Sequence, residues 1–132
     1  MTNNNKIVII GGGLAGCEAA YQISKFDINV DLYEMRPKVK TEAHQTKYLA
    51  ELVCSNSFRS DDKEYNAVGV LHEELRIADS LIMKTADNNK VPAGSALAVD
   101  RDDFAKEVHK TISSISNINV INKEVKDLNE FN

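Results

Sequence analysis

The sequence has few cysteines and no excess of positive charge, and each shortage argues against a class of function. Its two cysteines, Cys17 and Cys54, are far apart and form no C-x-x-C pair. Neither has metal-ligand spacing, so no metal site is expected. The net charge of −4 does not fit a generally basic nucleic-acid-binding protein. Any contact with RNA must then come from a local patch, a partner or sequence absent from this chain.

The chain also lacks the hydrophobic segments that direct a protein into or across a membrane. No run of 18 apolar residues occurs, so no membrane span is expected. The first residues, Met1–Lys6, show no signal-peptide pattern. We therefore expect a cytoplasmic location with both thiols reduced. The sequence indicates no particular oligomeric state.

The N-terminal residues contain a pattern typical of dinucleotide binding. The apolar segment Lys6–Ile10 predicts a strand that is buried on both faces. Gly11, Gly13 and Gly16 follow it directly as G-x-G-x-x-G, and an apolar helical pattern begins at Leu14. Strand, glycine turn and helix in this order are the context that the motif requires.

Each glycine of the motif has its own expected task. Gly11 permits the tight turn, Gly13 lets a pyrophosphate approach the backbone, and Gly16 allows the helix to pack closely on the strand. The start of the helix adds free N–H groups and a positive dipole end for phosphates. The candidate cofactor-binding residues of the turn are Gly11, Gly12, Gly13, Leu14, Ala15 and Gly16.

A second predicted strand, Asn29–Glu34, ends in an acidic residue. Glu34 lies 18 positions after Gly16 (34 − 16 = 18). An acid about 20 residues beyond the glycines is placed to accept hydrogen bonds from a ribose. Residues 6–34 therefore predict a βαβ unit with a nucleotide site. The alternative is a glycine-rich turn that only packs a helix on a sheet.

The next part of the chain combines a long irregular segment with a predicted helix. Residues 35–65 have no clear period, and a connection this long in an α/β domain is typical of a functional loop. A helix is predicted over residues 66–88 because apolar residues there recur every three or four positions. The stripe expected to be buried is Val68, Leu71, Leu75, Ala78 and Ile82.

The C-terminal part predicts a short strand at 96–99, a helix over 100–116 and a third parallel strand over about 118–126. Asp100 suits the N-cap of that helix. Three parallel strands with intervening helices make an incomplete doubly wound sheet with one unpaired edge. We therefore expect residues 1–132 to be the N-terminal part of a longer α/β protein.

The type of dinucleotide domain follows from the position and length of the glycine motif. It begins within about ten residues of the N-terminus and extends as G-x-G-x-x-G-x-x-x-A from Gly11 to Ala20. NAD and FAD proteins share the core motif, but this form fits FAD proteins of the glutathione-reductase type. The predicted fold class is a Rossmann-like, three-layer FAD-binding domain, present only in part.

Cys54 is the candidate for covalent chemistry. A thiolate is a strong nucleophile near neutral pH, and Cys54 lies in a polar segment with His44 and Arg59 nearby in sequence. The alternative is a half-buried, inert thiol. Cys17 lies among small residues of the first predicted helix, where packing is its expected role. His44 is a candidate for phosphate or flavin contact.

Several segments together resemble one family. In chain order they are GGGLAGCEAA (11–20), LYEMRP (32–37), AELVCSNS (50–57), NAVG (66–69), VPAG (91–94) and ALAVDR (96–101). They are similar to the folate- and FAD-dependent tRNA (uracil-5-)-methyltransferases, the TrmFO family. The chain corresponds only to the N-terminal part of a typical member.

The resemblance implies a reaction and a set of site residues. A one-carbon unit passes from 5,10-methylenetetrahydrofolate to carbon-5 of a uracil in the T loop of tRNA, with FAD as cofactor and NAD(P)H as reductant. Cys54 would act near the flavin, as nucleophile toward uracil or as general base. The glycine turn and Glu34 match FAD contacts, and Arg36 and Arg101 lie in matching motifs near the cofactor. Val125 matches a position that contacts adenine through its backbone.

Parts of the family pattern are missing from this chain. The further cysteine that the family places well into its later part is absent. So are the later strands of the FAD fold and the region that would hold tRNA, and the chain alone is therefore expected to be inactive. Two alternatives stay open. One is the same chemistry on ribosomal RNA, and the other is an FAD-binding subunit of the complex that modifies wobble uridines. The Met35-Arg36-Pro37 and Cys54 motifs favour the methyltransferase.

Overall fold

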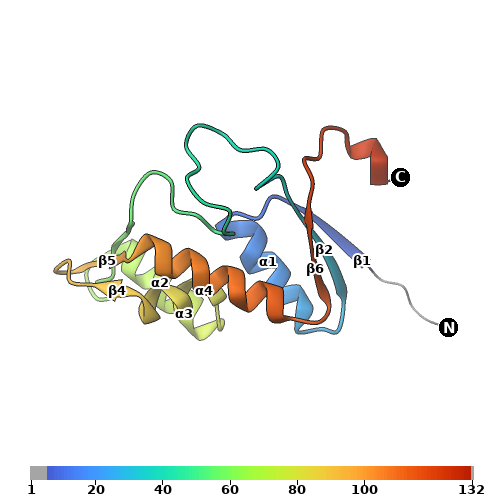
Figure 1. Ribbon diagram of the computed structural model, residues 1–132. Helices are drawn as coiled ribbons and strands as arrows, with labels where there is room; N and C mark the ends of the chain where they lie inside the picture. Colours follow the sequence, from blue (N-terminus) through green and yellow to red (C-terminus); the bar gives the residue numbers. More distant parts are fainter. Residues whose placement is uncertain (1–5, 132) are drawn as a thin grey trace.

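The computed structural model describes residues 6–131, in which helices lie between two sheets (Figure 1). The larger sheet is parallel, with strand order β1-β2-β6. Its strands are β1 (Lys6–Ile10), β2 (Asn29–Glu34) and β6 (Ile118–Asn122). Helix α1 (Leu14–Ser24) connects β1 to β2 and packs on both. The parallel βαβ unit expected from the sequence is therefore present, while the third strand ends four residues earlier than expected.

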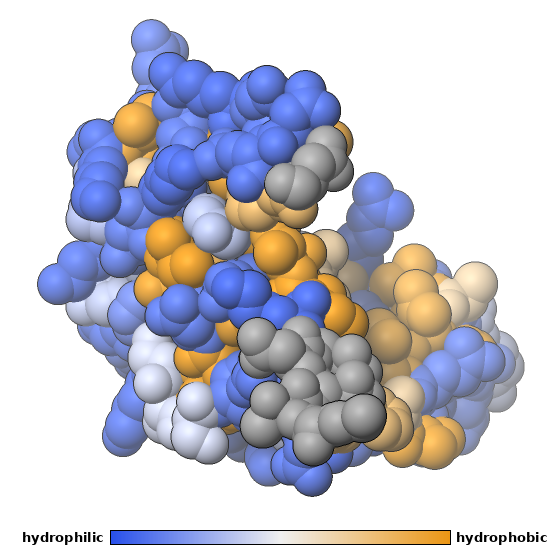
Figure 2. All heavy atoms as spheres, turned by 90° about the vertical axis from the view of Figure 1, so that its right-hand side faces the viewer, coloured by the Kyte–Doolittle hydropathy of each residue, from blue (hydrophilic) through white to orange (hydrophobic). Residues whose placement is uncertain are grey.

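Helices cover only one face of the parallel sheet (Figure 1). Ile9 points toward α1 and packs against the core, whereas Ile10 is 48% exposed. Figure 2 turns the uncovered side toward the viewer and shows apolar atoms between polar ones. The prediction that Lys6–Ile10 is buried on both faces is wrong, because no α-helix among residues 6–131 covers the second face.

The smaller sheet is antiparallel and has the order β3-β5-β4. It contains β3 (Ser57–Ser60), β4 (Lys90–Val91) and β5 (Ala96–Val99). The segment 35–65, in which no strand was predicted, thus contains one. Only one of the four β3 residues is apolar, so its sequence alone has no strand signal, and pairing with the buried β5 supplies the missing stabilisation.

The prediction of a single helix over residues 66–88 is wrong. The chain forms α2 (Ala67–Ile77) and α3 (Leu81–Asn88) instead. Asp79 between them has φ +55°, a left-handed conformation that a right-handed helix does not continue. Ser80 then caps α3, and its hydroxyl oxygen accepts a hydrogen bond from the Met83 N–H.

The break between the two helices also divides the predicted apolar stripe. Ile82 of α3 is buried, but Leu71 and Leu75 of α2 are exposed, Leu71 by 51%. The buried residues of α2 are Gly69 and His72. A Cβ on Gly69 would overlap the Asp62 backbone, so α2 approaches the preceding segment through its smallest residue and turns its leucines outward.

Helix α4 (Arg101–Ser114) leads from the small sheet back to β6 (Figure 1). The Asp100 carboxylate caps it by accepting hydrogen bonds from the backbone N–H groups of Asp102 and Asp103, each at 3.0 Å. A 3-10 helix, η1 (Leu128–Phe131), follows β6. No helix among residues 6–131 has the length and apolar character of a membrane span. The largest fully buried core side chains are Phe104, Leu32, Leu49, Met83, Leu97 and Ile112.

Candidate functional site

The glycine turn between β1 and α1 has the geometry that its sequence predicts. Gly11 has φ +104°, which strongly favours glycine, and its N–H donates to the Tyr33 carbonyl at 2.8 Å. A Cβ on Gly16 would overlap the Gly11 carbonyl oxygen. Helix α1 can therefore lie this close to the turn only because residue 16 has no side chain.

The other side of the glycine turn is open. A Cβ built on Gly11 or Gly13 would meet no atom within 4 Å. Gly13 is also the N-cap of α1, and no side chain satisfies the free N–H groups there. These groups and the helix dipole suit an anion such as a pyrophosphate. The turn opens onto a cavity of about 370 Å³, lined by Ile10, Gly11, Gly12, Gly13, Tyr33, Glu34, Met35, Arg36, His44, Glu51, Lys123, Glu124 and Val125.

Glu34, at the end of β2, is buried in the wall of this cavity. Its Oε2 accepts the Gly12 N–H at 3.0 Å, and its Oε1 accepts the Arg36 backbone N–H at 2.9 Å and Nε at 2.8 Å. Burial raises the pKa of Glu34, but hydrogen bonds from Arg36 and Gly12 outweigh burial and hold the pKa below its ordinary value. Glu34 is therefore a carboxylate at neutral pH and can accept hydrogen bonds from ribose hydroxyls.

Like the lining residues Lys123 and Glu124, Glu51 is a residue of this site that the sequence did not identify. Its Oε2 accepts the Arg36 Nη1 at 2.8 Å, and its Oε1 accepts the backbone N–H groups of Gln45 at 2.8 Å and Thr46 at 3.2 Å. Burial raises the pKa of Glu51, yet these hydrogen bonds lower it further than burial raises it. The only available signal was an acid three positions before Cys54.

The ends of β2 and β6 meet at the same edge of the sheet. The Lys123 N–H donates to the Glu34 carbonyl at 3.0 Å, and the Asn122 side-chain amide donates to the Arg36 carbonyl. Val125 follows directly and lines the cavity, as His44 does from the long loop. The structure thus brings the predicted residues Glu34, Arg36, His44 and Val125 together with the glycine turn.

Five predicted residues do not line this cavity. Leu14, Ala15 and Gly16 begin α1 directly after the lining residue Gly13, whereas Cys54 and Arg101 lie farther along the chain. Cys54 is an exposed free thiol in the loop before β3. Arg101, at the start of α4, donates to the Leu52 carbonyl at 3.4 Å and lines a smaller hollow of about 110 Å³, which Glu51 also borders. The structure therefore does not place Arg101 beside the glycine turn, although Glu51 adjoins both hollows.

Cys17 has the packing role that the sequence predicts. It is fully buried on α1, and its thiol donates to the Gly12 carbonyl at 3.4 Å. Burial raises the pKa of Cys17 to about 12, so the thiol stays protonated at neutral pH. Of the two thiols, only Cys54 is placed to react with a molecule in solution.

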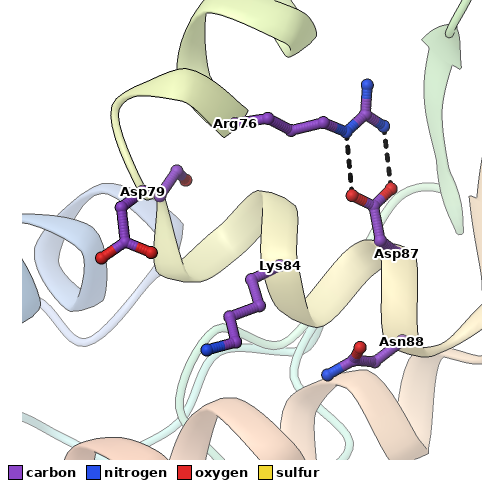
Figure 3. A pocket seen from close by; sticks show the side chains of 6 residues that line it. Arg76, Asp79, Lys84, Asp87 and Asn88 are labelled. Carbon is purple, nitrogen blue, oxygen red and sulfur yellow. Dashed lines mark hydrogen bonds and ion pairs between the residues drawn. The ribbon is translucent and has the colours of Figure 1, made fainter.

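A second cavity of about 310 Å³ lies between α2 and α3. Figure 3 shows Arg76 reaching from α2 toward Asp87 of α3, with two hydrogen bonds of 2.8 Å. Asp79, also in its wall, pairs with Lys25 at 2.7 Å. Most charges here are matched within the protein, and the α3 N-terminus beside the cavity is already capped by Ser80 and Glu18, so it does not resemble a nucleotide site.

The parallel βαβ unit, the open glycine turn and the acid at the end of β2 define a dinucleotide-binding, Rossmann-type protein. The chain belongs to the family described as glucose inhibited division protein A (GIDA), whose model matches residues 6–132. Its similarity to curated proteins is more specific.

The relatives bear the names that the sequence motifs predict. The chain is 59% identical over 128 residues to the methylenetetrahydrofolate--tRNA-(uracil-5-)-methyltransferase TrmFO of Jannaschia sp. (strain CCS1), covering 97% of this chain and 28% of the relative. It is 61% identical over 124 residues to the TrmFO of Bartonella henselae, covering 94% of this chain and 26% of the relative. The resemblance to TrmFO is confirmed, and the chain spans little more than a quarter of these relatives.

The fold is also found in a solved structure. Aquifex aeolicus GidA in its form II crystal superimposes with a TM-score of 0.70 at 15% identity, covering 94% of this chain and 21% of that chain. The predicted fold class, a partial Rossmann-type FAD-binding domain, is confirmed by this match and by the family model.

Proposed function

We propose that the chain binds FAD at the glycine-turn cavity and contributes this site to methylation of uracil carbon-5 in the T loop of tRNA, in the cytoplasm. The observation that carries the proposal is the open turn at Gly11 and Gly13 beside the ionised Glu34. The names of the relatives support the choice of reaction. Methylenetetrahydrofolate is the proposed carbon donor, and NAD(P)H the proposed reductant.

The residues of the cavity divide the binding of FAD among them. The α1 N-terminus offers the N–H groups of Leu14 and Ala15 to the pyrophosphate. Glu34 accepts hydrogen bonds from the ribose, and the backbone at Val125 adjoins the adenine. When bound, FAD supplies the redox chemistry that converts the transferred one-carbon unit into a methyl group. Arg36 holds Glu34 in the ionised state that ribose binding requires.

Cys54 carries the proposed covalent or acid–base step. Uracil carbon-5 is a poor nucleophile until a thiolate adds at carbon-6, and the same thiol could instead serve as a general base. Cys54 is exposed in a loop, so a base of a large RNA substrate can reach it. Arg101 begins the helix whose first turn contacts this loop at Leu52.

The nucleotide site is tested with Gly13→Ala. The added methyl group meets no protein atom, and replacement of an N-cap glycine by alanine costs about 1 kcal/mol. Titration calorimetry with FAD should show binding to the wild-type chain and at least a roughly tenfold loss in the variant, because the methyl group occupies the path of the pyrophosphate. Ser113→Ala, at an exposed position of α4, should bind like the wild type. Equal affinities for Gly13→Ala and the wild type would refute the site.

The role of Cys54 is tested with Cys54→Ala in the complete open reading frame that encodes this chain. Methylation of tRNA in the presence of folate and NAD(P)H should fall by at least about a thousandfold, as expected for loss of a covalent or acid–base group, while FAD absorbance is retained. Wild-type turnover by Cys54→Ala would exclude both roles of the thiol.

Two other substrates are compared in the same assay. The glycine-rich turn with AGCEAA at residues 15–20 supports, as a second candidate, an FAD-binding subunit for wobble-uridine modification. Methyl transfer to ribosomal RNA is the other alternative. Product analysis of tRNA and ribosomal RNA separates the three, since only the proposed function places a methyl group on carbon-5 of a T-loop uracil.

A further inference from the structure

Three charged side chains connect the glycine turn to the long loop. Glu34, Arg36 and Glu51 form a continuous chain of ion pairs, with distances of 2.8 Å on both sides of the guanidinium. Their side chains are only 6%, 3% and 9% exposed. Charges so deeply buried are costly unless they are paired and hydrogen-bonded, so this arrangement constrains all three groups.

The two carboxylates of this chain differ in what they leave free. Both oxygens of Glu51 accept hydrogen bonds from within the protein, from Arg36, Gln45 and Thr46. Oε2 of Glu34 accepts only the Gly12 N–H among the described residues, and a carboxylate oxygen can accept more than one. Glu34 thus keeps capacity for a ligand, whereas Glu51 is saturated and acts on the cavity only through Arg36.

The segment that Glu51 organises also holds the glycine turn from outside. The Ala50 N–H donates to the Gly12 carbonyl at 2.8 Å, and a Cβ on Gly12 would lie 2.5 Å from Leu49 Cδ2. Gly12 is therefore held on three sides, by Glu34, Ala50 and Leu49. Two of these contacts come from the residues immediately before Glu51.

We propose that Glu51 is a positioning residue of the nucleotide site, which acts through Arg36 to aim Oε2 of Glu34, with its remaining capacity to accept a hydrogen bond, at the ribose hydroxyls. The same side chain holds residues 45–51 against the glycine turn. This inference rests on the proposed binding of FAD. It predicts that loss of the Glu51 charge weakens recognition of the ribose in particular, beyond any general loss of affinity.

The test is a cycle that combines the Glu51→Gln variant with removal of the ribose hydroxyls from the ligand. ADP and 2′,3′-dideoxy-ADP are titrated into the wild-type chain and into Glu51→Gln. Because hydrogen bonds to a charged group are at stake, the wild type should prefer ADP about tenfold or more, and the variant about threefold or less. Glu42→Gln is the matched control, since Glu42 lies exposed in the same loop and forms no ion pair among residues 6–131.

Each outcome decides the question. A parallel fall in affinity for both nucleotides would mean that Glu51 only stabilises the fold, and the inference would be overturned. An unchanged preference in Glu51→Gln, or no preference in the wild type, would overturn it while leaving the nucleotide site intact. No binding of ADP at all would overturn the inference together with the proposed function. If Glu51→Gln does not fold, Glu51→Asp replaces it. That variant should prefer ADP over 2′,3′-dideoxy-ADP by a factor between about threefold and tenfold.

Discussion

Two regions of this molecule use the same arrangement, an arginine between two carboxylates, for different purposes. One lies at the glycine turn and the other between α2 and α3. They are named here by their arginines: the Arg36 cluster is Glu34, Arg36 and Glu51, and the Arg76 cluster is Asp61, Arg76 and Asp87. The first adjoins the proposed nucleotide site, and the second lines the cavity of Figure 3.

The two clusters differ in how deeply the arginine is buried and in how many hydrogen bonds their carboxylates already accept. The Arg36 side chain is 3% exposed and that of Arg76 is 24% exposed. Arg76 meets Asp87 with two hydrogen bonds and Asp61 with two more, and His72 and Lys90 also contact the Asp61 carboxylate. The Arg36 cluster instead leaves Glu34 with capacity for a ligand. The buried Arg36 cluster, beside the open glycine turn, thus organises the proposed binding site. The more exposed Arg76 cluster instead joins α2 to α3.

The largest expected difference follows from removing each arginine. Arg36→Met leaves two buried carboxylates unpaired and should lower the free energy of unfolding by about 3–5 kcal/mol. Arg76→Met should lower it by only about 1–2 kcal/mol, because water can solvate the carboxylates that remain. Urea unfolding followed by circular dichroism measures both values. Equal losses would show that burial does not distinguish the clusters.

A second comparison concerns one glycine in each region. A Cβ on Gly16 would overlap the Gly11 carbonyl oxygen, and a Cβ on Gly69 would overlap the Asp62 backbone. Each Gly→Ala variant should lose about 1–3 kcal/mol of stability through overpacking, reduced by up to about 1 kcal/mol through better helix propensity. Only Gly16→Ala should also lose ADP binding in calorimetry. Loss of binding in Gly69→Ala would mean that the regions are coupled.

The smallest expected effect is on how the free energy of unfolding changes at acidic pH. Glu51 and Asp61 both have a pKa held below the ordinary value, which is 4.5 for Glu51 and 3.8 for Asp61; burial raises each pKa, and hydrogen bonds outweigh it. Since the folded protein holds these protons less tightly than the unfolded chain, their contribution to stability is complete above the ordinary pKa and falls as the pH drops below it.

The two clusters should therefore respond to acid at different pH. Glu51→Gln should flatten the loss of unfolding free energy that begins below about pH 4.5, and Asp61→Asn should flatten the part that begins below about pH 3.8. Urea unfolding at pH 3 to 7 measures both slopes. An acid slope in either variant that equals the wild-type slope would contradict this assignment.

The parts of the structure that could be predicted have their causes close together in the sequence. The turn at Gly11 to Gly16 needs glycine because of its own backbone and the adjacent helix. The cap at Asp100 involves residues two and three positions away. Local patterns of this kind are visible in a single sequence.

The parts that could not be predicted depend on distant partners. Leu71 and Leu75 continue an apolar stripe into α3, but the left-handed Asp79 interrupts it without a glycine or proline as signal. Glu51 looks like an ordinary loop acid until Arg36, fifteen positions earlier, is folded against it. Cys54 and Arg101 belong to recognisable motifs, yet neither lines the cavity that the glycine turn opens.

The glycine turn, the acid after β2 and the family motifs were enough to specify a dinucleotide site and the TrmFO resemblance, because each is written in a short stretch of chain. Tertiary structure alone showed that Glu51 pairs with Arg36 beside that site. Burying charge is favourable only when partners converge from separate segments, and such convergence exists only in the folded chain.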